Sequence, residues 1–117
     1  MNVSDLTDSL FQDDLLAARQ WVKDARSQSL RFATLPPPAG LDDARYAAAA
    51  GLVELFAKRN GEQPPEWAVQ APAAPRDVWL DKGLLAVPSL KAHAERHAPE
   101  ALRRRRLFAL PDFLSTV

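Results

Sequence analysis

The sequence predicts an all-α domain in which two long antiparallel helices precede a shorter, loop-rich helical C-terminal half. Apolar side chains recur with helical spacing in two long segments, at about residues 5–30 and 42–59. The alternation typical of a half-buried strand is scarce. Prolines separate the two segments and recur through the second half, where they favour short elements. A chain of 117 residues is expected to form a single domain over residues 1–117.

The first long segment is expected to form one helix from near Asp5 to about residues 27–30, within an N-terminal region 1–34. Ser4 or Asp5 can cap its first amides. Its apolar stripe consists of Phe11, Leu15, Ala18, Val22 and Ala25. Residues 35–40 follow with three prolines, which predict a stiff connector of extended geometry.

The second long helix is predicted from about Asp42 to Arg59, with Asp42 or Asp43 as its cap and a stop at Asn60-Gly61. Four alanines at residues 47–50 and Gly51 give it small side chains, which let another helix approach closely. Its apolar stripe consists of Ala49, Leu52, Val53 and Phe56.

The second half is expected to contain only short elements. Residues 77–87 fit either a short helix closed by Gly83 or extended segments. The other elements expected there are a helical turn at residues 64–67, a helix from Ser89 to about His97, a short helix from Pro99 to about Arg105, an extended segment at residues 107–110 and a last turn capped by Asp112.

Composition excludes several chemistries. The chain has no cysteine, which excludes disulfides, thiol catalysis and cysteine-ligated zinc. The N-terminus lacks the pattern of a secretory signal, and no apolar run approaches the about 20 residues of a membrane span. We therefore expect a cytoplasmic protein of bacterial type that does not bind membranes.

No arrangement of residues predicts catalysis or a cofactor. His93 and His97 share a helical face, but two ligands make no metal site and the chain has no other histidine or cysteine. The four scattered glycines form no phosphate-binding loop. No serine or cysteine is paired with a histidine in a recognisable nucleophile motif. We expect a protein that is not an enzyme and needs neither cofactor nor metal.

Two tryptophans are candidates for contact with a partner. Trp67 and Trp79 lie in proline-rich, loop-like sequence, and tryptophan is enriched at interaction hot spots. The sequence favours the alternative that they pin irregular segments onto a small core, because this half of the chain has few other large apolar residues.

The most unusual feature is a run of four arginines, Arg103, Arg104, Arg105 and Arg106. Four residues span a full helical turn, so at least one guanidinium must face inward and needs a carboxylate or carbonyl partner there. The others are candidates for a partner's carboxylates or, alternatively, for nucleic acid. Fifteen basic and fifteen acidic residues balance in the whole chain, so the electrostatic footprint of a nucleic-acid-binding protein is lacking.

The second half also carries an ordered series of motifs. These are Leu35-Pro36-Pro37-Pro38-Ala39-Gly40, residues 51–61, Pro64-Pro65-Glu66-Trp67, Trp79, residues 88–92, residues 99–105 and Asp112. With this series, residues 35–117 resemble the C-terminal region of bacterial helix-turn-helix antitoxin/regulator proteins, which are predicted partners of nucleotidyltransferase-type toxins.

The resemblance implies an antitoxin-like component of a toxin–antitoxin system. About thirty residues precede the proline connector, too few for a complete helix-turn-helix domain, so the family's DNA binding is not implied. The expected function is a protein-interaction module that occludes a partner, such as a toxin encoded by the adjacent gene. The alternative is a nucleic-acid-binding accessory or regulatory protein that uses the arginine run. Homodimerisation is compatible with both.

Overall fold

The computed structural model describes residues 1–115 and is mostly helical, with 57% helix and 3% strand, which confirms the all-α class. The helices are α1 (Val3–Phe11), α2 (Leu15–Ser27), α3 (Asp43–Arg59), α4 (Glu66–Gln70), α5 (Pro88–His97) and α6 (Glu100–Arg103), with 3-10 helices η1 (Phe32–Thr34) and η2 (Lys82–Ala86) and strands β1 (Val78–Trp79) and β2 (Leu107–Phe108). Among the described residues, no helix has the length and apolar character needed to cross a membrane.

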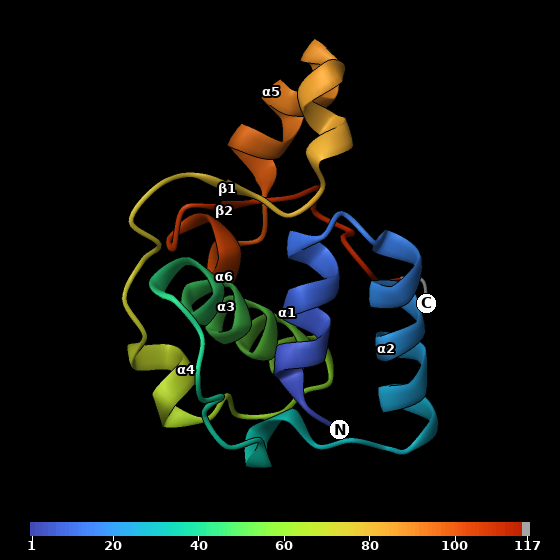
Figure 1. Ribbon diagram of the computed structural model, residues 1–117, viewed down its shortest axis with the longest axis vertical. Coiled ribbons are helices and arrows are strands. Elements are labelled where there is room, and N and C mark those ends of the chain that lie inside the picture. The colour runs from blue at the N-terminus through green and yellow to red at the C-terminus, as the bar shows by residue number, and fades with distance from the viewer. Residues whose placement is uncertain (116–117) are drawn as a thin grey trace.

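Helix α3 is the centre of the fold. Every residue from Ala47 to Ala57 is buried, as expected for a helix that other elements cover on all sides. Helices α1, α4 and α6 and the turn η1 all pack against it, and Figure 1 shows them around it. The Asp42 carboxylate caps the helix by accepting a hydrogen bond from the Arg45 amide at 2.8 Å. The boundaries predicted for this helix are confirmed.

The single long N-terminal helix was a wrong prediction, because the segment is broken into α1 and α2. Asp13 has a φ of 60°, a left-handed conformation that aspartate tolerates better than most residues. The next residue, Asp14, starts α2 by accepting a hydrogen bond from the Ala17 amide at 3.0 Å. The expected pair of long antiparallel helices is thus replaced by two shorter helices, packed on each other and joined by a turn, beside one long helix (Figure 1).

The short elements of the second half lie close to their predicted positions. Helix α5 covers the segment predicted from Ser89, α6 the segment after Pro99, and β2 part of the extended segment 107–110. The ambiguous residues 77–87 contain both alternatives, since β1 is extended and η2 is helical. Strands β1 and β2 pair in parallel, with Val78 opposite Leu107 and Trp79 opposite Phe108.

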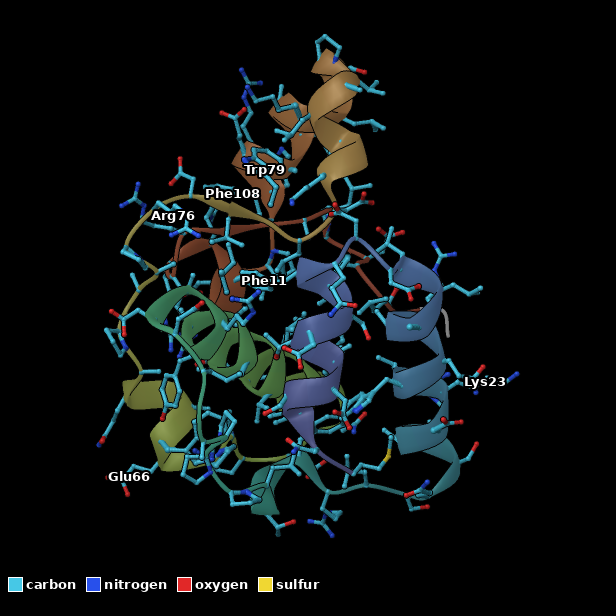
Figure 2. All side chains as sticks on the ribbon, viewed as in Figure 1. Phe11, Lys23, Glu66, Arg76, Trp79 and Phe108 are labelled. Carbon is cyan, nitrogen blue, oxygen red and sulfur yellow. The ribbon has the colours of Figure 1, made fainter. Side chains whose placement is uncertain are left out.

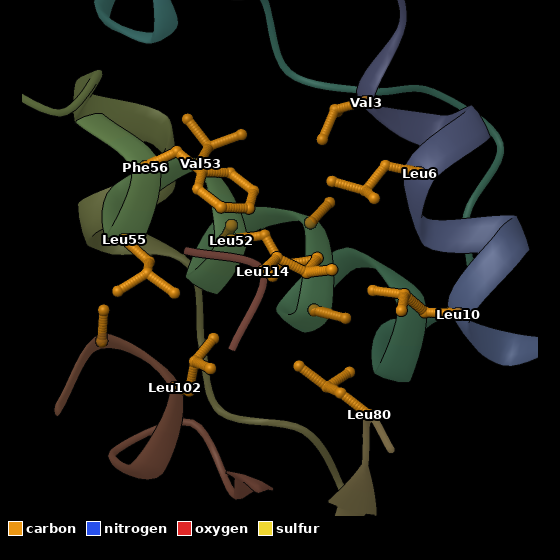
Figure 3. Packing of buried hydrophobic residues seen from close by; sticks show 14 of the residues in the cluster. Val3, Leu6, Leu10, Leu52, Val53, Leu55, Phe56, Leu80, Leu102 and Leu114 are labelled. Carbon is orange, nitrogen blue, oxygen red and sulfur yellow. The ribbon is translucent and has the colours of Figure 1, made fainter. Parts of the chain in front are cut away.

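One hydrophobic cluster holds these elements together. It includes Leu6 and Leu10 from α1, Leu52 from α3, and Leu80 and Leu102 from the second half, and Figure 3 shows their side chains converging. Both halves of the chain therefore contribute to the same core. The projecting element of the fold is α5, at the top of Figure 1.

Gly51 is the point of closest approach between α3 and the C-terminal half. A Cβ added there would lie 2.8 Å from Leu107 Cδ1, 3.1 Å from Leu102 Cδ2 and 3.2 Å from the Ala101 carbonyl oxygen. Both leucines are completely buried, so they have little room to move aside. The small residues of this helix thus permit the close approach that the sequence predicted.

We predict that Gly51→Ala destabilises the protein by about 1 kcal/mol. Overpacking typically costs about 1–3 kcal/mol, and the higher helix propensity of alanine offsets about 1 kcal/mol of it. Urea unfolding measures the change. In a Leu107→Ala background the closest contact is relieved, and the same substitution should become neutral or stabilising. Stabilisation by Gly51→Ala in the otherwise unchanged chain would show that the contact is not restrictive.

Candidate protein-interaction site

Three of the four arginines in the run pair with carboxylates of the same chain. Both terminal nitrogens of Arg104 donate hydrogen bonds to the Glu54 carboxylate, and the Nη1–Oε2 distance is 3.0 Å. Arg105 Nη2 lies 3.1 Å from Glu54 Oε1. Arg106 Nε lies 2.9 Å from Asp77 Oδ1. Carboxylates of the same chain thus neutralise much of the positive charge of the run, which was predicted to contact a partner or nucleic acid.

Arg105 is the inward-facing arginine that the sequence required. Its side chain and that of Glu54 are each 1% exposed. Besides Glu54, the guanidinium donates hydrogen bonds to the carbonyls of Ala101, at 2.7 Å, and Ala68. These contacts connect α3, α4 and α6, so the buried arginine has a structural role. Its Nε has no hydrogen-bond partner among the described residues.

Glu54 remains ionised because cations surround it. Burial by itself would raise the pKa of Glu54, but hydrogen bonds from Lys58 and Arg105 and the charges of Arg105 and Arg104 hold it below the usual range. Burial also lowers the pKa of Arg105, which Glu54 partly counteracts. One carboxylate here faces three cations, so the half-exposed Lys58 and Arg104 leave a local excess of positive charge.

Arg103 is the one arginine of the run that pairs with no carboxylate among the described residues. It is exposed, and its Nη1 donates to the Arg96 carbonyl, which links α6 to the end of α5. Arg103, Arg104 and Arg106 all keep exposed atoms, so each of them is accessible to a partner. Their contact with a partner stays a prediction.

The two candidate tryptophans occupy different environments. Trp67 donates its indole hydrogen to the Leu35 carbonyl at 2.8 Å, and its ring lies 5.9 Å from that of Tyr46. It thereby pins the proline connector to the body, which is the alternative role considered from the sequence. Trp79 instead stacks on Phe108 at 5.1 Å between ring centroids, and both rings are half-buried.

Residues 82–97, here named the arm, project beyond Trp79, and the sequence did not identify them as a contact surface. The arm consists of η2 and α5, which pack chiefly on each other. Within the arm only Leu84 and Ala94 are buried. Leu85, Val87 and Leu90 are 45%, 41% and 39% exposed, and they are three of the six large apolar side chains exposed in the described chain. In the sequence, the apolar run Leu84-Leu85-Ala86-Val87 could have indicated this exposed apolar surface.

A groove of about 230 Å³ lies at the base of the arm. Phe11 and Leu10 line it from α1, Trp79 and Leu80 from the chain at β1, and Leu85 from the arm. Arg76, Asp77 and Lys82 lie among its polar lining residues. Figure 2 shows Phe11, Arg76, Trp79 and Phe108 near this junction. Leu85 therefore belongs both to the groove and to the exposed apolar side chains of the arm.

His93 and His97 both lie exposed on the arm, with ring centroids 4.9 Å apart. Within residues 1–115, no cluster of three or more histidine, aspartate or glutamate side chains could hold a metal ion, and these two histidines are no exception. The arm thus offers apolar contact area more clearly than coordination chemistry.

We predict that Glu54→Gln lowers the free energy of unfolding by about 3–5 kcal/mol, because it leaves the buried charge of Arg105 without a counterion. Urea unfolding at neutral pH measures the loss. The matched control is Asp77→Asn, which removes an exposed partner of Arg106 and should cost less than about 1 kcal/mol.

The effect of Glu54→Gln should also depend on pH. The folded-state pKa of Glu54 is lowered, so its contribution is complete above the unfolded pKa of about 4.3 and is lost as the pH falls through the folded value. The stability difference between the two proteins should therefore shrink in acid. A difference that stays constant down to the acid transition would contradict the role given to the charge.

Neither a protein-family model, nor a curated protein, nor a solved structure matches this chain. The resemblance to antitoxin/regulator proteins therefore stays a prediction, and function has to be argued from the geometry described above.

Proposed function

We propose that this protein is a non-enzymatic protein-interaction module whose contact surface is the arm together with the groove at its base. The observation that carries the proposal is the exposure of Leu85, Val87 and Leu90 on a segment of which only two side chains are buried. Exposed apolar patches are typical of interaction sites, whereas singly scattered apolar side chains are ordinary, and three of the six exposed large apolar side chains of the described chain belong to the arm.

The arm gains free energy when a partner covers its exposed apolar side chains. Burying one leucine or valine side chain contributes about 1.5–3 kcal/mol. The arm leaves three such side chains substantially exposed in the isolated chain. Trp79, at the base, adds an aromatic ring of the type enriched at hot spots. Because the three aliphatic side chains are 39–45% exposed, a partner that covers them would gain roughly two-fifths of this free energy from each.

In its more specific form, the proposal is an antitoxin-like protein that occludes a toxin encoded by the adjacent gene. Its support is the ordered motif series between Leu35 and Asp112. The arm supplies apolar contact in such a complex through Leu85, Val87 and Leu90. Occlusion requires only surface contact, so it needs no catalytic group.

The nucleic-acid alternative is less well supported. Glu54 and Asp77 already hold Arg104, Arg105 and Arg106, and a paired guanidinium gains less from a phosphate than a free one. Retention on DNA at about 50 mM salt, abolished by changing the four arginines to glutamine, would favour this alternative.

The test is co-expression with the product of the adjacent gene, followed by co-purification at moderate salt. We expect a stable complex that Leu85→Asp and Leu90→Asp each weaken at least about tenfold in Kd, which corresponds to about 1.4 kcal/mol. Both side chains are exposed, so folding should be unchanged, and circular dichroism checks this.

The matched control is Leu16→Asp, because Leu16 is 78% exposed on α2 and belongs neither to the arm nor to the lining of the groove. This variant should bind like the unaltered protein. Failure of the two products to co-purify would remove the antitoxin-like form of the proposal. Equal binding by the arm variants and the Leu16 variant would remove the arm as the contact surface.

A further inference from the structure

We propose that the groove beneath the arm receives one large apolar side chain of the partner and that Arg76 binds a carboxylate next to that side chain. This inference rests on the proposed function, since it specifies the chemistry of the partner. The partner is accordingly a protein segment in which an aromatic or large aliphatic residue is flanked by aspartate, glutamate or a chain-terminal carboxylate.

The size of the groove selects one side chain. Sites for drug-sized molecules have volumes of about 300–1,000 Å³, and this groove, at about 230 Å³, is smaller. Its apolar lining comes from Phe11, Trp79, Leu80 and Leu85. An interface anchor that fills a pocket of this kind is the usual form of a binding hot spot.

The charges around the groove favour an anion. Asp77 is paired with Arg106 at 2.9 Å, and Lys82 lies 3.5 Å from Asp13. Arg76 is exposed and forms no ion pair with any residue in the described part of the chain. It therefore provides the one uncompensated charge among the residues that line the groove.

The acidic residues next to this region are already engaged. The backbone amide of Arg45, followed by its guanidinium, lowers the pKa of Asp42, and the nearby charge of Arg76 adds only the smallest contribution, so Asp42 is bound chiefly by Arg45. Asp81 accepts a hydrogen bond from the Gly83 amide at 3.1 Å and lines the neighbouring hollows, not this groove. A carboxylate brought by a partner would therefore meet a free guanidinium.

The indole of Trp79 offers a second free donor. The other two tryptophans donate their indole hydrogens to backbone carbonyls, Trp21 to Asn2 at 3.0 Å and Trp67 to Leu35 at 2.8 Å. Trp79 has no such acceptor among residues 1–115, although its ring is half-buried. Arg105 Nε is the only buried side-chain nitrogen or oxygen without a partner in the described chain, so the Trp79 indole nitrogen is open to solvent and an acceptor from the bound segment can take the place of water there.

The experiment is a titration of the full-length, ¹⁵N-labelled protein followed by NMR, with N-acetylphenylalanine as the probe. This molecule joins one apolar side chain to one carboxylate. We expect saturable shifts of the Trp79 indole signal and of amides between residues 76 and 85. N-acetylphenylalaninamide, which lacks the carboxylate, should bind at least about fivefold more weakly, because it forms no charge-assisted hydrogen bond.

Two arginine variants separate the specific effect from a general one. Arg76→Gln should remove the preference for the carboxylate, while Arg19→Gln, at an exposed position on α2, should preserve it. No saturable shift near the groove, equal affinity for the acid and the amide, or an unchanged preference in Arg76→Gln would each overturn the inference.

The outcome can be distinguished from failure of the proposed function. If Leu85→Asp and Leu90→Asp disrupt the complex but the groove does not bind the N-acetylphenylalanine probe, the arm is a contact surface and this inference is wrong. If a second copy of the chain were the occupant, sedimentation would show concentration-dependent self-association that Leu85→Asp abolishes, which would overturn the assignment to a foreign acidic segment.

Discussion

The buried ion pair between Glu54 and Arg105 is the interaction on which the rest of the structure depends. It joins residues 51 positions apart in the chain, and the same guanidinium reaches backbone carbonyls of α4 and α6. Removing two charges from water is unfavourable unless each finds close partners, so this pair is stable only when all three helices are in place. The contact therefore couples the packing of α4 and α6 to that of α3. Gly51, one turn earlier in α3, provides the space that lets Leu102 and Leu107 approach.

The arm follows from this arrangement. The backbone of residues 74–80 runs beside residues 105–108, with hydrogen bonds from Ala74 to Arg105 and from Val78 to Arg106. The chain between these two fixed stretches has to leave the body and return, and it does so as η2 and α5. Because few of its side chains are buried, the arm is stabilised less by the core than α3 is. Segments of low local stability are often those that bind partners, which agrees with the function proposed for it.

The arginine run illustrates how a conspicuous sequence feature can serve the interior of a protein. Arg105 is buried, and Arg104 and Arg106 are paired within the chain. Among the residues that line the groove, the free charge lies at Arg76, an isolated arginine that nothing in the sequence distinguishes from the others. The surface best suited to a partner combines this charge with the apolar side chains of the arm and the half-buried ring of Trp79. Of the six residues expected at an interface, Trp79 is the one whose position fits that surface most directly.

The sequence by itself determined the helical class, the central helix with its aspartate cap, and most of the short elements, because periodicity, capping and proline geometry are local properties. It also determined that one arginine of the run must face inward. The sequence did not predict the break of the N-terminal helix at Asp13, because the apolar stripe continues through this position and the adjacent aspartates give only a weak capping signal. Only the tertiary structure decided that Glu54 is the partner of Arg105, that β1 pairs with β2, and that the arm and its groove stay uncovered. These features join residues far apart in the chain, and no local pattern specifies which distant side chain completes a buried charge or covers an apolar face.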